Sequence, residues 1–319
     1  MSVVIPCFNA EVWIGEALKS VACQDVGSLE TIVVDDGSID ASASIVRREF
    51  EWVRLIEVDH QGSSRARNLG TRAARGRFIQ YLDADDMLAP GKMKAQLSAL
   101  EASGADVAYG SWQEVRCEAN GITRPGRVVD RRIEGSPEIE LFTDFWCPPA
   151  AYLFRRELIE KVDSWNERLP VIQDARFVLD CALHGGKFVY CPGIMAYYRI
   201  HASESLSRRD PVEFVRDCLR NAVGVEQWWR DRGELSMDRR AALIKVYSHV
   251  ARASFHNDHE TFEAAYHALV TLAPGYVPES PRHLAAVARL IGYRRAEAVA
   301  LRYRRAKRLL RTLAGRKDS

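Results

Sequence analysis

The feature that most constrains the fold is a series of short apolar runs separated by helix-length segments. Runs rich in β-branched and aromatic residues occupy residues 2–8, 29–34, 53–58, 77–82 and 106–109. The intervals between them leave the dozen or more residues that a crossover between parallel strands requires. The sequence therefore predicts an α/β fold, with a mostly parallel sheet that helices cover on both faces.

Most of the intervals have the length and pattern of helices, and we expect these over residues 11–22, 41–51, 63–74 and 90–103. Glycine and proline punctuate residues 110–172, which predicts loops and a few antiparallel strands. A helix over 175–184 and a strand over 187–191 should follow, and the pattern is mostly helical after residue 211. The expected division is an α/β domain of residues 1–208 and a helical region of residues 209–319.

The charge of the chain is balanced overall but not along its length. Lys and Arg (45) against Asp and Glu (43) give +2, which argues against a dedicated nucleic-acid binder. Residues 282–319 hold twelve basic and two acidic residues, so this segment carries +10 and the rest −8. No window approaches the 18 apolar residues of a membrane span, and the strand-like run from residue 2 predicts no leader. The seven Cys include no CxxC pair, which favours reduced thiols and the cytosol.

Polar clusters follow three of the predicted strands, at residues 6–11, 35–38 and 83–86. In open α/β sheets ligands bind beyond the carboxyl ends of the strands. Neighbouring charges among Asp83, Asp85 and Asp86 would repel by about 4 kcal/mol at 4 Å and an effective dielectric of 20. A divalent cation that a diphosphate also holds would compensate for this repulsion, although a solvated acidic turn is the alternative.

Two further segments have the chemistry of a nucleotide site. Asp35 and Asp36 can accept hydrogen bonds from a ring N–H or a sugar hydroxyl, unless the turn serves only to cap the next helix through Ser38 or Asp40. Residues 62–70 open a helix whose free N–H groups can bind phosphate, and Arg67 would add a charged contact.

Four of these segments together resemble the successive motifs of the family 2 inverting glycosyltransferases of GT-A (Rossmann-like) fold. The matching segments are VVIPCFN at 3–9, IVVDDGS at 32–38, ARNLG at 66–70 and LDADD at 82–86, and the resemblance spans residues 1–206. It implies a nucleotide-sugar donor, whose base and ribose are held by Pro6, Phe8 and Glu11 in the first segment and by Asp35 and Asp36 in the second. It also implies that residues 83–85 are the DXD motif, with Asp83 nearer the ribose and Asp85 on Mg or Mn.

The family also places an acid pair, usually Glu-Asp, before a later helix, and here Gln173 and Asp174 stand at that position. Gln173 departs from the pattern. Asp174 matches the acid that serves as general base towards the acceptor hydroxyl, although it could instead cap the helix that follows. His201, in YRIH at 198–201, resembles a late motif in which a His reaches the metal or the diphosphate, although a structural role is the alternative.

The last predicted helix combines an apolar stripe with basic flanks. The stripe comprises Val299, Tyr303, Ala306, Leu310 and Leu313. Such a helix can lie on anionic lipid, and it can equally pack on the catalytic domain or on a second copy of the chain. An anionic membrane surface met through residues 282–319 and a homo-dimer are therefore both candidate partners.

The function that these observations favour is a metal-dependent inverting glycosyltransferase of the hexosyl type. It would move a sugar from a nucleoside diphosphate sugar, with UDP as the first candidate, to a hydroxyl of a glycan or lipid-linked glycan in surface polysaccharide biosynthesis. A nucleotidyltransferase would need a Gly-rich, basic loop after the first strand, which residues 6–11 lack. A receiver domain would not explain residues 83–86, whereas an inactive nucleotide-sugar-binding module stays open because of Gln173.

Overall fold

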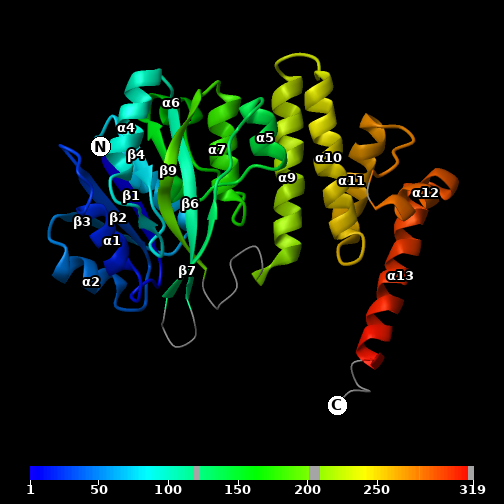
Figure 1. Cartoon of the computed structure of the whole chain (residues 1–319), viewed down its shortest axis with the longest axis horizontal. Coiled ribbons are helices and arrows are strands. Elements are labelled where there is room, and N and C mark those ends of the chain that lie inside the picture. Colours follow the sequence, from blue (N-terminus) through cyan, green and yellow to red (C-terminus); the bar gives the residue numbers. More distant parts are fainter. Residues whose placement is uncertain (118–122, 201–208, 280, 315–319) are drawn as a thin grey trace. The chain divides into compact units, whose positions relative to one another are not determined.

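The computed structural model describes residues 1–117, 123–200, 209–279 and 281–314, the last eleven of these by their backbone alone (Figure 1). The chain divides into two compact units, Met1–Arg209 and Asp210–Ser319.

Unit 1 is built on one mixed nine-stranded sheet in the order β3-β2-β1-β4-β8-β6-β9-β5, with β7 paired to β6. Its strands are β1 (Ser2–Cys7), β2 (Glu30–Asp36), β3 (Val53–Val58), β4 (Phe78–Tyr81), β5 (Met87–Leu88), β6 (Val107–Cys117), β7 (Thr123–Val129), β8 (Tyr152–Arg155) and β9 (Phe188–Ile200). Strands β3, β2, β1 and β4 are parallel to one another, as are β6 and β9. The pairings β4–β8, β5–β9, β6–β7 and β6–β8 are antiparallel. The predicted α/β fold is confirmed, and the antiparallel strands include β7 and β8, in the region where the sequence predicted them.

The helices of unit 1 alternate with these strands. They are α1 (Ile14–Ala22), α2 (Ser42–Glu49), α3 (Ser63–Ala73), α4 (Lys92–Ser103), α5 (Pro137–Thr143), α6 (Arg156–Val162) and α7 (Gln173–Leu183), with a 3-10 turn at Pro149–Ala151. All six residues of β1 are buried, as expected of a parallel strand covered on both faces. Helix α3 packs directly on β1 at Gly70, where an added Cβ would lie 2.4 Å from Val4 Cγ1. Only glycine permits this approach, which sets the position of α3 above the strand ends.

Unit 2 is helical. It contains α9 (Pro211–Arg230), α10 (Met237–Ser254), α11 (His259–Leu272), α12 (Arg282–Ile291) and α13 (Tyr293–Ala314). Trp229, Tyr247, Phe262 and Leu269 are almost fully buried and form its core. In the described part of the chain, no helix is both long enough and apolar enough to cross a bilayer.

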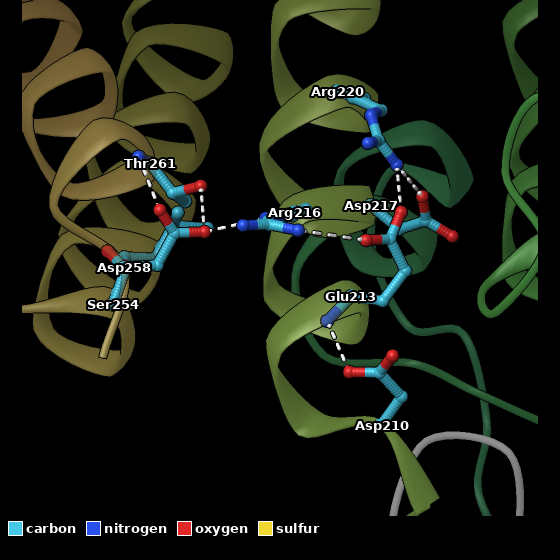
Figure 2. A network of polar contacts seen from close by, with 9 residues as sticks. Asp210, Glu213, Arg216, Asp217, Arg220, Ser254, Asp258 and Thr261 are labelled. Carbon is cyan, nitrogen blue, oxygen red and sulfur yellow. Dashed lines mark hydrogen bonds and ion pairs between the residues drawn. The ribbon is translucent and has the colours of Figure 1, made fainter. Parts of the chain in front are cut away.

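Polar contacts join α9 to α11 within unit 2 (Figure 2). Asp210 caps α9 by accepting a hydrogen bond from Glu213 N at 2.9 Å. Asp258 caps α11 by accepting from Thr261 N at 3.2 Å, and Arg216 Nε donates to the Asp258 carboxylate at 2.7 Å. The Asp258 carboxylate therefore caps the start of α11 and also binds a side chain of α9.

Candidate active site

The loops that follow β1 and β2 are fastened to each other by side-chain hydrogen bonds. Asn9 N donates to Ser38 Oγ, and Ile39 N donates back to Asn9 Oδ1, both at 2.9 Å. Asn9 adopts a left-handed backbone (φ 50°), which asparagine tolerates better than most residues. The first two predicted clusters thus form one rigid edge beyond the sheet.

The three residues predicted in the first cluster have different environments. Pro6 is buried in β1 opposite Val34. Phe8 keeps 45% of its surface exposed and stacks on His60 with ring centroids 4.1 Å apart. The Glu11 carboxylate accepts from Ala41 N at 2.9 Å, so it closes the loop. Of the three, Phe8 presents an accessible flat surface suited to a base.

Asp35 and Asp36 are both buried at the end of β2, but only one has an unused acceptor. The carboxylate of Asp36 accepts from Gln61 N at 2.9 Å and from Gly62 N at 2.8 Å, and so orders the turn before α3. Asp35 Oδ2 accepts from Ser38 N at 3.1 Å. Among the described residues Asp35 Oδ1 is buried without a hydrogen-bond partner, which leaves it available to a ligand.

Arg67, on α3, is buried beside the third cluster. Its Nη2 is ion-paired with the Asp83 carboxylate, and its guanidinium lies 4.4 Å from the centroid of the Trp165 ring. Trp165 is itself buried and stacked on Phe177, so it belongs to the core. Arg67 therefore contacts the predicted DXD motif directly.

Gln173 is the hub that connects α3 to α7. Its Oε1 atom accepts from Ser63 Oγ at 2.8 Å, from Ser64 Oγ at 2.7 Å and from Arg67 Nη1 at 3.2 Å. The neutral amide receives the three donors at the position where the family pattern has an acid. Because Gln173 carries no charge, Asp83 supplies the carboxylate that compensates Arg67.

The acidic cluster consists of Asp83, Asp85 and Asp86. Burial raises the pKa of Asp83, and Arg67 opposes that rise. Burial also raises the pKa of Asp86 well above its usual range, and the charges of Asp85 and Asp83 add to the effect. Asp86 Oδ1 accepts from Arg199 N at 2.8 Å, whereas Asp86 Oδ2 is buried without a partner in the described residues.

Arg199, on β9, is a site residue that the sequence reasoning missed. Its buried guanidinium donates to Glu16 Oε2 at 2.6 Å and lies 4.3 Å from the centroid of the Trp13 ring. Together with its backbone bond to Asp86, these contacts fix the acidic cluster to β9 and α1. Arg199 is part of the YRIH segment at 198–201, where the sequence prediction considered the histidine alone.

Asp174 lies in the first turn of α7. Helix α7 has Ile172 as its N-cap residue, so Asp174 is not the cap that the alternative interpretation required. Its Oδ2 accepts from Trp146 Nε1 at 2.8 Å, and its Oδ1 from Ala175 N at 2.8 Å. Trp146 therefore orients the candidate base.

Trp146 and Tyr198 connect Asp174 to the acidic cluster. Trp146 Nε1 donates to Asp174, and the Trp146 ring contacts the Tyr198 ring with centroids 5.4 Å apart. The next residue, Arg199, donates its backbone N–H to Asp86. Consistent with this arrangement, burial raises the pKa of Tyr198, and the charges of Asp86 and Asp174 raise it further. His201, the other predicted metal ligand, lies outside the described residues.

Comparison with known proteins identifies the family. The profile described as Glycosyl transferase family 2 matches residues 2–163, half of the chain. The chain is a family 2 glycosyltransferase. A protein of Haemophilus influenzae described as an uncharacterized glycosyltransferase is 29% identical over 187 residues, which are 57% of this chain and 71% of that protein. An uncharacterized glycosyltransferase of Nostoc is 28% identical over 212 residues, which are 64% of this chain and 66% of the relative. The succinoglycan biosynthesis protein ExoO of Rhizobium meliloti is 34% identical over 121 residues, 37% of this chain and 35% of that protein.

Solved structures place this glycosyltransferase in the GT-A fold and confirm the predicted fold class. S. aureus TarS 1-349 in complex with UDP-GlcNAc matches with a TM-score of 0.65 at 20% identity, over 96% of this chain and 91% of that one. The mannosyltransferase PcManGT of Pyrobaculum calidifontis, in complex with GDP-Man and Mn2+, matches with a TM-score of 0.55 at 18% identity, over 93% and 85%.

Proposed function

We propose that this glycosyltransferase is metal-dependent and inverting, and that it transfers a hexosyl group from a UDP-sugar to a hydroxyl of a glycan or glycolipid in surface polysaccharide biosynthesis. The observation that carries the proposal is the position of Asp174. Its carboxylate accepts from the Trp146 N–H, and the Trp146 ring contacts Tyr198, the neighbour of the Arg199 N–H that binds Asp86. The UDP-GlcNAc complex of TarS and the name of ExoO support the choice of donor and pathway class.

The donor would lie along the ends of β1, β2 and β4. The exposed Phe8 ring offers a stacking surface for the base, and Asp35 Oδ1 offers a buried acceptor for a ring N–H or a ribose hydroxyl. Asp83, next to Arg67, would stand nearer the ribose. Pro6, Glu11 and Asp36 would act by shaping the loops that surround the nucleotide.

The oxygen donors of the acidic cluster fit Mg or Mn. The described residues contain no group of three or more metal-ligating side chains arranged around a common point. Mg2+ takes one or two carboxylates and fills its other positions with phosphate oxygens and water, so Asp85 and the donor diphosphate would suffice. The unpartnered Asp86 Oδ2 is a further acceptor in the same cluster, and His201 stays a proposed ligand from the sequence. Bound there, the ion would act as a Lewis acid and template for the departing diphosphate.

Asp174 would be the catalytic base. Its carboxylate accepts the proton of the acceptor hydroxyl while that oxygen bonds to the anomeric carbon and the bond to the diphosphate breaks. A single displacement of this kind inverts the anomeric configuration. Trp146 Nε1 donates to Asp174 Oδ2 and so fixes the orientation of the carboxylate.

The test is the Asp174→Asn variant. Because Asn cannot accept the proton, we expect the rate of transfer to fall by about 10²- to 10⁴-fold. The product formed by the wild type should have the inverted anomeric configuration. UDP binding in the presence of Mn2+ should persist, as measured by thermal shift against GDP, CDP and dTDP. Asp25→Asn, which alters a surface carboxylate paired with Lys94, is the control. Full transfer activity in Asp174→Asn would show that Asp174 is not the catalytic base. UDP binding that does not change with added divalent salts would contradict the proposed metal dependence.

A further inference from the structure

Helices α12 and α13 expose apolar side chains along one face each. Val287 and Leu290 are three residues apart on α12, and Val299 and Tyr303 are four apart on α13, so each pair shares a face. Val287, Val299 and Tyr303 line a groove between the two helices. Leu290 is 85% exposed, Tyr303 59% and Val299 46%, which is unusual for three large apolar side chains in one region. We refer to these four residues as the apolar rows.

Arginines flank the apolar rows. Arg282 and Arg289 on α12, and Arg295 and Arg302 on α13, are all exposed. The members of each pair are seven residues apart, so they lie on one side of their helix. That side is about a third of a turn from the apolar row on α12 and about a fifth of a turn from it on α13. These four residues are the arginine rows.

Among the described side chains of α12 and α13, the acidic one is Glu297, and it does not reach the surface. Glu297 is fully buried, and its Oε1 lies 3.8 Å from Arg252 Nε, on α10. A fifth arginine, Arg294, is ion-paired with Glu263 of α11. The charge that α12 and the described side chains of α13 present outward is therefore positive along the whole face.

We propose that the apolar and arginine rows of α12 and α13 form a docking surface for an anionic phospholipid membrane. The apolar rows would enter the boundary between headgroups and acyl chains, and the arginine rows would meet the lipid phosphates. The charge pattern favours lipid over a second copy of the chain, because a symmetric dimer through this face would bring identical arginine rows together. It favours lipid over nucleic acid because phosphate backbones would leave Leu290 and Val299 exposed to water. The inference does not depend on the proposed transfer reaction.

The first test uses the full-length wild type and no variant. Flotation with vesicles of phosphatidylcholine and phosphatidylglycerol should carry the protein upward, and vesicles of phosphatidylcholine alone should not. Binding should weaken as salt is added, because salt screens exposed charges. Failure to float with the anionic vesicles at low salt overturns the proposal.

Two double variants separate the two components of the surface. Each arginine near an anionic surface is worth about fivefold in binding, so Arg295→Gln with Arg302→Gln should bind roughly 25-fold more weakly. Leu290→Ser with Tyr303→Ser should weaken binding while it leaves the salt dependence in place. The matched control, Arg72→Gln with Lys245→Gln, removes the same charge from exposed positions on α3 and α10.

Three outcomes would contradict the assignment. If the control loses as much binding as the Arg295/Arg302 variant, the attraction is nonspecific. If sedimentation of the wild type without lipid shows a dimer that the Leu290/Tyr303 variant abolishes, the face binds a second copy of the chain. If the arginine variant lowers the unfolding temperature and leaves lipid binding unchanged, the face packs within the chain. Unchanged unfolding temperatures in all variants, with the binding losses above, support the membrane surface.

Discussion

Gln173 illustrates how one neutral side chain can organise a charged site. Its amide oxygen accepts from Ser63, Ser64 and Arg67, and it is almost fully buried. A carboxylate there would compete with Asp83 for Arg67. The amide instead accepts the hydrogen bonds and leaves the ion pair with Arg67 to Asp83.

The substitution Gln173→Leu tests this role. It removes the acceptor of the buried donors on Ser64 and Arg67 and of the half-buried Ser63, and Ser64 keeps only a longer contact with Asn166 O at 3.4 Å. We therefore expect the free energy of unfolding to fall by about 1–3 kcal/mol. Gln173→Glu should retain most of that stability, because a carboxylate oxygen accepts the same bonds. Urea unfolding of the three proteins measures both effects. Equal losses in the two variants would show that the residue's shape, and not its acceptor, is what matters.

Trp146 has the same kind of influence on Asp174. Trp146→Phe keeps an aromatic ring at this position but removes the indole N–H that donates to Asp174 Oδ2. We expect kcat to fall about tenfold, since a hydrogen bond to a charged group is worth roughly 1.5–3 kcal/mol and part of it is lost, while KM for the donor stays unchanged. Trp52→Phe, at an exposed position beside β3, is the control. A change confined to KM would assign Trp146 to substrate binding.

At the level of elements, the sequence predicted the parallel strands well because their signal is local. Residues 2–8, 29–34, 53–58 and 77–82 are short runs rich in apolar residues, and β1 to β4 lie within or beside them. Strand β9 was predicted to end at residue 191, because Pro192 and Gly193 interrupt the pattern. It continues to Ile200, since a shift in register between Gly110 and Trp112 of β6 absorbs the extra residues. A register shift of this kind depends on both strands, so the sequence of β9 alone does not predict it.

The helices show the same limit. Helix α7 was predicted from residue 175 but begins at Gln173, which places both residues of the altered acid pair inside its first turn. Short helices α5 and α6 were not predicted at all, because seven residues give too few turns for a periodic signal. The sequence placed Asp83 and Asp174 in the site, but the contact of Ser64 with Gln173 spans 109 residues and is readable only from the fold.

The cap of α11 allows a prediction at this scale. Burial would raise the pKa of Asp258, but hydrogen bonds from Thr261 and Arg216 outweigh it and hold the pKa below its usual range. Asp258→Ala should therefore destabilise the protein by about 1 kcal/mol through the lost cap, with a smaller part from Arg216. Asp210→Ala removes a cap without the Arg216 ion pair and is the matched control.

The pH dependence of that difference has a defined sign. A carboxyl whose pKa is lower in the folded state stabilises the protein above its unfolded pKa, near 3.9, and loses this contribution as the pH falls through the folded value. The gap in unfolding free energy between wild type and Asp258→Ala should therefore be full at pH 6 and should shrink below about pH 4. A gap that persists unchanged in acid would show that packing, and not the carboxylate charge, stabilises the end of α11.

At the scale of the whole molecule, all the described site residues belong to unit 1, from Pro6 to Arg199. Unit 2 has its own buried core around Trp229 and Phe262 and its own polar network. The charge asymmetry follows this division, since the +10 segment 282–319 lies within unit 2. The proposed transfer site and the proposed membrane surface therefore belong to different units of the chain.

This division predicts how ligands affect unfolding. A ligand that binds only the folded form stabilises the unit that binds it, by about 2.7 kcal/mol at a ligand concentration 100 times the Kd. UDP with Mn2+ should therefore raise the unfolding temperature of unit 1 and slow hydrogen exchange at the ends of β1, β2 and β4. Exchange in α9 to α11 should stay unchanged, as followed by mass spectrometry of their peptides. Equal protection in both units would show that the chain unfolds as one cooperative body, whatever the separation of its cores.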